Sequence, residues 1–183
     1  MAEPITIARA QPPGAGALVS VALMPPATRF SFRGGAEAAD ACAAAFGCAL
    51  PRDACRAAEA EGRAALWLGP DEWLLLAPET GGEALFAAIE EGLGAVPHAL
   101  VDISHRQVGF AVAGAEASTL LNTGCPLDLD GSAFPVGMCT RTVLAKSDVA
   151  LWRVAQTLFR LEVNRSFADY VAAYLRVAER GLG

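Results

Sequence analysis

The sequence has few of the residues that hold metals, nucleotides or disulfides. It contains two histidines and five cysteines, an odd number without any C-x-x-C spacing. No acidic residues stand at ligand spacing from the histidines, so we expect no metal site. No glycine-rich loop follows a predicted strand, so we expect no nucleotide cofactor in this chain. Small buried thiols are the prediction for all five cysteines, which are Cys42, Cys48, Cys55, Cys125 and Cys139.

Basic residues are scarce as well. The chain has 14 lysines and arginines against 20 acidic residues, which gives a net charge of −6 and a pI near 4.9. An acidic chain offers no counter-charge to nucleic acid or to an anionic membrane, so we expect neither as a partner. The N-terminus lacks a basic segment followed by an apolar one, and no apolar run is long enough to span a bilayer. These features predict a cytoplasmic protein.

Hydrophobic residues are abundant, at 54% of the 183 residues. A chain of this size buries roughly 70% of its unfolded surface, so we expect a solid core. We predict a proline- and glycine-rich N-terminal arm over residues 1–16 and a single domain over residues 17–183. The domain consists of two similarly patterned halves, about residues 17–96 and 97–183.

Hydrophobic periodicity predicts the elements of each half. In the first half, strands are predicted at Leu18–Leu23, Thr28–Arg33, Arg63–Leu68 and Glu72–Ala77, and helices at Ala36–Phe46 and Gly82–Leu93. Residues 48–62 are predicted to be a loop with room for one short strand. In the second half, strands are predicted at Leu100–Ser104, Gln107–Ala113, Met138–Lys146, Val149–Val154 and Thr157–Val163, and helices at Ala115–Thr123 and Ser166–Arg180.

Both halves therefore follow the order strand, strand, helix, connection, strands, helix, or β-β-α-β-β-(β)-α. Strands are more numerous than a series of parallel βαβ units needs, which predicts an α+β fold with antiparallel sheets. The two strands of the hairpin between residues 63 and 77 are apolar at nearly every position. This pattern predicts a sheet that is covered on both faces, or on one face by helices and on the other by a partner.

Three local features carry further expectations. Ser147 and Asp148 are predicted to form the turn of the hairpin in the second half. Ser166 is predicted to cap the last helix, with Asp169 at capping-box spacing. The apolar stripe of that helix is expected to pack on the core, and its members are Phe167, Tyr170, Val171, Tyr174, Leu175 and Ala178.

The polar segment around Asp102, Ser104 and His105 is where a search for chemistry begins. A nucleophile and its base must lie within hydrogen-bond reach, whereas neighbouring strand residues point to opposite faces. We therefore expect a polar cluster that shapes the end of the strand, and a hydrolase built on Ser104 and His105 is the weaker alternative. His98, the second histidine, is expected to be exposed.

Arginines and tryptophans complete the set of candidates. The arginines of the second half are expected to extend along apolar surface and pair with acids, the alternative being an anion site or a contact with a partner chain; they are Arg106, Arg141, Arg153, Arg160 and Arg165. Core packing is expected for the tryptophans, the alternatives being a stacking platform for a cofactor or a contact with a partner protein; they are Trp67, Trp73 and Trp152.

Several motifs together resemble the gamma subunits of heterotetrameric sarcosine oxidase. The motifs are Leu68-Gly69-Pro70-Asp71-Glu72-Trp73-Leu74-Leu75, Val101-Asp102-Ile103-Ser104-His105-Arg106, Gly124-Cys125-Pro126-Leu127-Asp128-Leu129, Cys139-Thr140-Arg141-Thr142 and Arg165-Ser166-Phe167-Ala168. The resemblance extends from about residue 60 to the end of the chain.

The resemblance implies a complex with alpha, beta and delta subunits that demethylates sarcosine oxidatively to glycine. The one-carbon unit passes to tetrahydrofolate or is released as formaldehyde, and oxygen is reduced to hydrogen peroxide. In that family FAD, FMN, NAD and zinc belong to the other subunits, and the gamma chain has no assigned catalytic residue. The chain is thus expected to have no catalytic, cofactor-binding or metal-binding residue of its own. Its implied task is structural, as a wall between the flavin site and the folate site.

The second half also resembles, distantly, the folate-binding module of aminomethyltransferases. This resemblance implies the duplicated α+β fold of that family, and it places Asp148 near the acidic residue that acts on folate there. Lys146-Ser147-Asp148 lacks the glycines and the paired acid of the module. An autonomous folate-dependent aminomethyltransferase that uses Asp148 is therefore the alternative function.

Overall fold

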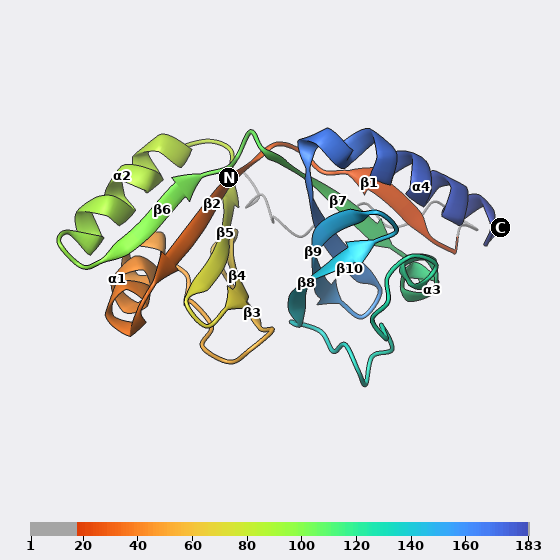
Figure 1. Cartoon of the computed structure of the whole chain (residues 1–183), viewed down its shortest axis with the longest axis horizontal. Helices are drawn as coiled ribbons and strands as arrows, with labels where there is room; N and C mark the ends of the chain where they lie inside the picture. The colour runs from red at the N-terminus through yellow and green to blue at the C-terminus, as the bar shows by residue number, and fades with distance from the viewer. Residues whose placement is uncertain (1–17, 183) are drawn as a thin grey trace. The chain divides into compact units, whose positions relative to one another are not determined.

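The computed structural model describes residues 18–182 and divides them into two compact units (Figure 1). The first unit spans residues 26–104, and the second combines residues 18–25 with residues 105–182. Each unit has one five-stranded sheet and its own hydrophobic core. The predicted N-terminal arm, residues 1–16, lies outside the described residues. That residues 17–183 form a single domain stays a prediction.

The sheet of the first unit has the strand order β3-β4-β5-β2-β6. Its strands are β2 (Ala27–Gly34), β3 (Ala57–Ala60), β4 (Arg63–Gly69), β5 (Glu72–Pro78) and β6 (His98–Asp102). Helices α1 (Ala36–Phe46) and α2 (Gly82–Leu93) cover one face of this sheet, because residues from both helices share a core with β2, β4 and β5. Gly47 ends α1 in the left-handed conformation, at φ 72°, and its N–H donates to the Ala43 carbonyl.

The sheet of the second unit has the order β1-β7-β10-β9-β8. Its strands are β1 (Ser20–Leu23), β7 (Gln107–Ala113), β8 (Cys139–Leu144), β9 (Ser147–Ala155) and β10 (Leu158–Asn164). Helices α3 (Ala117–Asn122) and α4 (Ala168–Arg180) share a core with this sheet. The 3₁₀ turn η1 (Arg165–Phe167) leads into α4. On β10 the alternate residues Phe159, Leu161 and Val163 are fully buried, as their spacing predicts.

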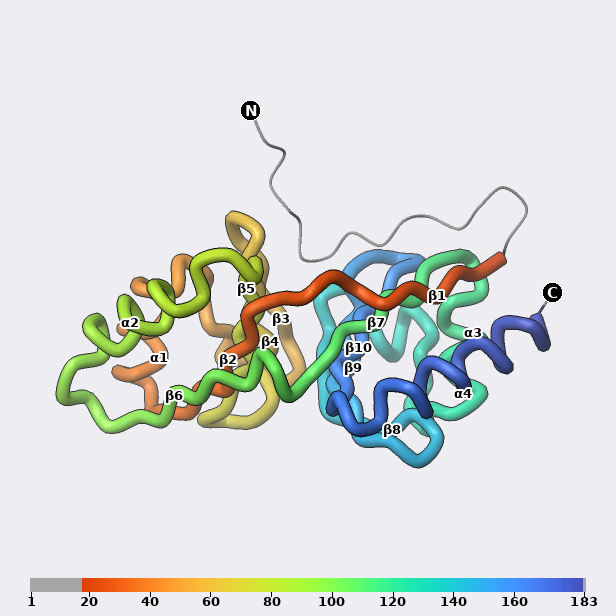
Figure 2. Tube along the Cα trace, turned by 90° about the horizontal axis from the view of Figure 1, so that it is seen from above, coloured from red at the N-terminus to blue at the C-terminus, as the bar shows by residue number. Residues whose placement is uncertain are grey.

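The element order confirms the predicted pattern of two halves with antiparallel sheets. The series β1-β2-α1-β3-β4-β5-α2 is repeated as β6-β7-α3-β8-β9-β10-α4, and every described strand pair is antiparallel. The first strand of each series, however, pairs into the sheet that the other series forms. Thus β1 pairs with β7, and β6 pairs with β2. Figure 2 shows the two connections that result, the red one after β1 and the green one after β6.

Buried residues lie on both faces of each sheet, as the apolar hairpin predicts for the first unit. On the face that does not join the helix-covered core, the first sheet buries Leu66, Leu74 and Leu76. The corresponding face of the second sheet buries Trp152, Arg160 and Glu162. An apolar core therefore lies under the helices of each unit. Both sheets place charge on their other buried face, where the first sheet buries Arg29 opposite Leu76.

Two local predictions are wrong. The turn between β8 and β9 is formed by Ala145 and Lys146, and Ser147 and Asp148 already belong to β9, opposite Leu144 and Val143. Strand pairing decided this register, because it buries Leu144 and Ser147, although it holds Ala145 at φ 53°. Ser166 does not cap α4, since it lies inside η1 and the helix begins without a side-chain cap.

Candidate functional site

The segment after β6 is a tight polar turn. The Asp102 carboxylate accepts the Ser104 N–H at 2.8 Å, which closes an Asx-type turn. The Ser104 Oγ accepts the N–H of Arg29, on β2, at 2.9 Å, and the Ile103 N–H donates to the Arg29 carbonyl at 2.9 Å. These bonds fasten the end of β6 to the start of β2.

The His105 ring takes no part in these hydrogen bonds. Among residues 18–182 its ring makes no hydrogen bond, so Ser104 and His105 do not form a nucleophile–base pair. One residue further on, the Arg106 carbonyl accepts the Arg165 N–H at 2.8 Å, within the second unit. The chain is thus held on both sides of His105, where the two units adjoin in sequence.

His98 differs from its expected exposure. Its side chain is 12% exposed, because the ring stacks on Phe32 with centroids 6.5 Å apart. The Nδ1 atom lies 2.7 Å from the Val96 carbonyl, and Nε2 lies 3.4 Å from a Glu90 carboxylate oxygen. These contacts join the start of β6 to α2, so His98 has a packing role.

Arg153, on β9, is buried and holds the connection between α3 and β8. Its guanidinium donates to the carbonyls of Leu129 and Phe134, at 3.2 and 2.9 Å, and to that of Gln156 at 2.7 Å. It also lies over the Phe159 ring, 5.0 Å from the centroid. The expected extension to the surface is therefore wrong for Arg153, because the carbonyls supply acceptors inside the fold.

Arg160 and Glu162 form a buried ion pair on β10. The residues are two apart and share a face of the strand, and the Arg160 Nε lies 2.6 Å from a Glu162 carboxylate oxygen. Both side chains are almost fully buried. A buried pair of this kind contributes little net stability, whereas loss of one partner leaves a buried charge. Arg106, Arg141 and Arg165 are exposed.

The tryptophans and cysteines follow their predictions closely. Trp73 and Trp152 are buried, and Trp67 is partly buried against the core of the first unit. The Trp73 indole N–H donates to the Pro51 carbonyl at 2.8 Å. All five cysteines are free thiols and four are buried, with Cys55 half-buried. Burial raises the pKa of the Cys42 thiol to about 12, which keeps it protonated and unreactive.

Asp148, the candidate residue for folate binding, lies on the exposed surface of the hairpin of β8 and β9. It is exposed on β9 and faces Val143 of β8 across the strand pair. In the part of the chain that the structure describes, its carboxylate makes no hydrogen bond or ion pair. The described residues also contain no group of three or more potential metal ligands. None of the helices between residues 18 and 182 is long and apolar enough to cross a bilayer.

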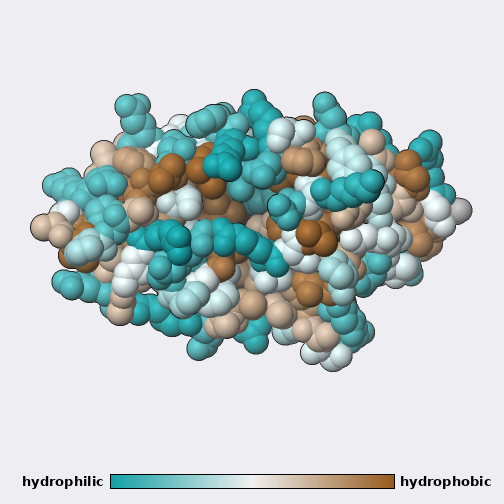
Figure 3. Space-filling model, viewed as in Figure 1, coloured by the Kyte–Doolittle hydropathy of each residue, from teal (hydrophilic) through white to brown (hydrophobic). Residues whose placement is uncertain are grey.

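Exposed hydrophobic side chains lie on α4, at the end of η1 just before it, and on β1. Phe167 and Tyr170 are 43% and 39% exposed, although their spacing predicted core positions, and Val177 is 60% exposed. Leu23, on β1, is 65% exposed, and β1 contacts α4. Figure 3 shows apolar side chains at the surface in the part of the view where α4 runs. Large exposed apolar groups that lie together mark an interaction surface.

Comparison with known proteins finds the same family that the sequence motifs resemble. A family model described as "Sarcosine oxidase, gamma subunit family" matches residues 33–180. The sarcosine oxidase subunit gamma of Arthrobacter sp is 35% identical over 179 residues, which are 95% of this chain and 86% of the relative.

Two solved structures share the fold. One is the heterotetrameric sarcosine oxidase of Corynebacterium sp. U-96 in complex with pyrrole 2-carboxylate, with a TM-score of 0.85 and 32% identity over 91% of this chain and 87% of that chain. The other is the glycine cleavage system aminomethyltransferase T of Bartonella henselae, with a TM-score of 0.66 and 14% identity over 87% of this chain and 45% of that chain. The second likeness concerns the fold alone.

Proposed function

The chain belongs to the sarcosine oxidase gamma subunit family, and from this premise we propose that it is a structural, non-catalytic subunit of a sarcosine oxidase complex. Its partners in the proposal are alpha, beta and delta subunits. The complex demethylates sarcosine oxidatively to glycine and transfers the one-carbon unit to tetrahydrofolate. FAD, FMN, NAD and zinc belong to the other chains.

One observation carries the non-catalytic role. The polar side chains of the central motif are engaged in building the fold, since Asp102 and Ser104 bind backbone N–H groups. Arg153 is likewise committed to three backbone carbonyls. Each of these groups therefore has a role in the fold, which supports a structural task for the chain. The free thiols support a reducing compartment, so the proposal places the complex in the cytoplasm.

Co-expression with the other three subunits tests the assembly. A stoichiometric four-chain complex is expected after affinity purification through a tag on any one subunit. A chain that stays apart from the other subunits would contradict the proposal. In the assembled complex, His105→Ala and Asp148→Asn should leave kcat and KM for sarcosine within twofold of the unmodified complex, because neither residue is given a catalytic task.

The alternative, an autonomous folate-dependent transferase, has less support from the structure. Asp148 faces Val143 and has no second acid beside it in the strand pair, so the hairpin does not fit the acidic site that the resemblance implies. Titration of the isolated chain with tetrahydrofolate separates the two functions. The structural proposal expects no binding at millimolar ligand, and saturable binding that Asp148→Asn abolishes would favour the transferase.

A further inference from the structure

The outer face of α4 differs in character from the rest of the helix. Val171 and Leu175 point into the core, whereas Tyr170, Ala173 and Val177, spaced by three and four residues, form an exposed stripe. Phe167 lies at the N-terminal end of this stripe and is also exposed. We call these four residues the α4 face. A helix that packs on one side only needs no such stripe for its own stability.

Leu23 extends the α4 face onto the sheet. It pairs directly with Phe110 of β7, and directly paired residues point to the same side of a sheet. Phe110 belongs to the helix-covered core, so Leu23 points to the side on which α4 lies. At 65% exposure, Leu23 is the most exposed large hydrophobic residue of the described chain. Leu23 and the α4 face therefore lie on the same side of the second sheet, on two elements that contact each other.

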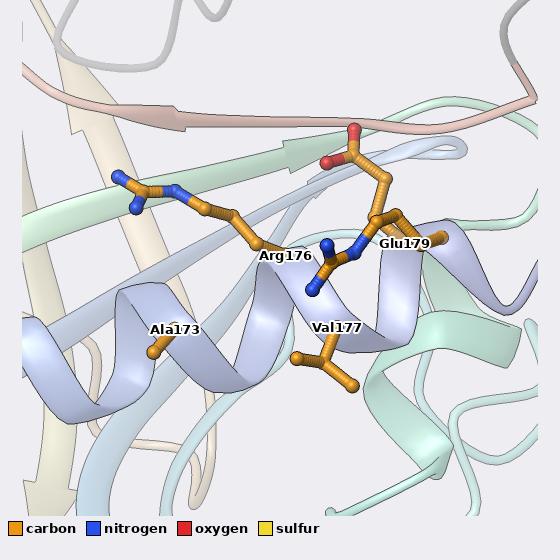
Figure 4. Close-up of a pocket in the computed structure, with 5 residues that line it drawn as sticks. Ala173, Arg176, Val177 and Glu179 are labelled. Atoms are coloured by element: carbon orange, nitrogen blue, oxygen red, sulfur yellow. The ribbon is translucent and has the colours of Figure 1, made fainter.

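Arginines border this surface. A hollow of about 480 Å³ lies against the C-terminal part of α4, and the described residues that line it are Ala173, Arg176, Val177, Glu179 and Arg180 (Figure 4). Aromatic residues and arginine are enriched at protein interfaces, whereas lysine is depleted, and α4 contains no lysine. The helix also carries the carboxylates of Asp169 and Glu179.

The charge of the chain is divided unevenly between its halves. Residues 26–104 contain 12 acidic and five basic side chains, a net charge of −7, and residues 105–183 contain seven acidic and eight basic ones, a net charge of +1. The acidic unit repels acidic proteins, and the near-neutral unit does not. An acidic partner therefore meets least repulsion at the second unit, where Arg176 and Arg180 offer counter-charges.

Resting on the proposed function, we infer that the α4 face and Leu23 bind another subunit of the complex through an apolar patch that is bordered by carboxylates. Tyr170 and Val177 would be the apolar anchors, and Arg176 and Arg180 the groups at the rim.

Substitutions on the α4 face test the inference in the complete complex. Val177→Asp places a charge in the apolar stripe, and Val101→Asp, on the exposed edge strand β6 of the first unit, is its matched control. We expect Val177→Asp to weaken association with the other subunits at least 30-fold and Val101→Asp to change it less than threefold. Circular dichroism and thermal unfolding of each isolated variant show that it is folded.

A charge exchange gives an independent measurement. The pair Arg176→Glu and Arg180→Glu should weaken association at least tenfold. The pair Arg33→Glu and Arg52→Glu changes the charge of the chain equally on the exposed surface of the first unit and should leave association within threefold.

The outcomes separate the inference from the function on which it rests. If the unmodified chain does not join the complex, the proposed function fails. If it joins and folded α4 variants associate within threefold of it, only the inference is wrong. A homodimer that Val177→Asp abolishes while the complex persists would assign the face to a second copy. Altered hydrogen exchange in residues 1–17 of the isolated Val177→Asp chain, with the complex unaffected, would assign it to this chain's own N-terminal segment.

Discussion

At the scale of single residues, the candidate reactive side chains of Asp102 and Ser104 hold the backbone in place through hydrogen bonds. The hydroxyl of Ser104 is placed to receive a backbone N–H of β2, and the carboxylate of Asp102 shapes the turn that presents it. A serine beside a histidine suggests catalysis in a sequence, but here the two side chains do not meet. The hydrogen bonds give both side chains a role in holding the end of β6 against β2.

Ser104→Ala should destabilise the fold. The Arg29 N–H would lose its acceptor near the start of β2, and an unpaired backbone donor costs about 1–3 kcal/mol. Urea unfolding measures the loss as a lower midpoint at unchanged slope. His105→Ala is the control, because the exposed ring makes no hydrogen bond and its removal should change the free energy of unfolding by less than about 0.5 kcal/mol. Equal effects of the two substitutions would contradict this interpretation.

Arg153→Met should have a larger effect. Methionine retains much of the side-chain volume but removes the donors from the Leu129 and Phe134 carbonyls, and we expect a loss of roughly 3 kcal/mol. Arg33→Met is the comparison, since its exposed ion pair with Asp71 is worth at most about 1 kcal/mol. Limited proteolysis should cut the Arg153 variant faster between residues 126 and 137. An unchanged cleavage rate there would show that Arg153 does not hold the connection.

At the scale of elements, one glycine allows β1 to join the second sheet. Gly114 ends β7 at φ 133°, and a Cβ at this position would lie 2.3 Å from the Leu18 carbonyl oxygen and 2.7 Å from the Cα of Val19. These contacts are with backbone, which cannot rotate away as a side chain does. The pairing of β1 with β7 in this sheet therefore requires a glycine, without a Cβ, at position 114.

Gly114→Ala should detach β1 or destabilise the second unit by about 3 kcal/mol, from strain at positive φ and from the steric overlap together. Gly137→Ala measures the strain at positive φ without the steric overlap. Gly137 also has positive φ, but nothing lies within 4 Å of its added Cβ, so a cost of about 1 kcal/mol is expected. Hydrogen exchange of the β1 amides distinguishes the two variants. Retained protection of β1 in Gly114→Ala would contradict the steric argument.

At the scale of the whole molecule, the charge division determines how association should respond to salt. Attraction between the arginines of α4 and an acidic partner is screened at high ionic strength, whereas apolar contacts are not. The dissociation constant for the other subunits should therefore rise several-fold between low and high salt. In the Arg176→Glu and Arg180→Glu variant this dependence should be smaller. A dissociation constant that falls with salt in the unmodified chain would indicate purely apolar docking.

The sequence alone determined the element types and their repetition. Periodicity placed α1 and α2 at the residues where the structure has them, and alternation placed Phe159, Leu161 and Val163 in the core. The motif set also identified the family. These properties depend on neighbouring residues along the chain, so local patterns are sufficient to predict them.

Only the tertiary structure decided which sheet β1 and β6 join, where the hairpin after β8 turns, and which side of α4 stays exposed. Pro25 and Pro26 lack N–H donors and favour extended backbone, which disfavours a hairpin between β1 and β2, but the choice of β7 as partner depends on long-range pairing and on Gly114. Phe167 and Tyr170 are apolar like core residues, and the sequence predicted them to be buried. Their exposure follows from how α4 rests on its sheet, and a one-dimensional pattern does not contain that contact.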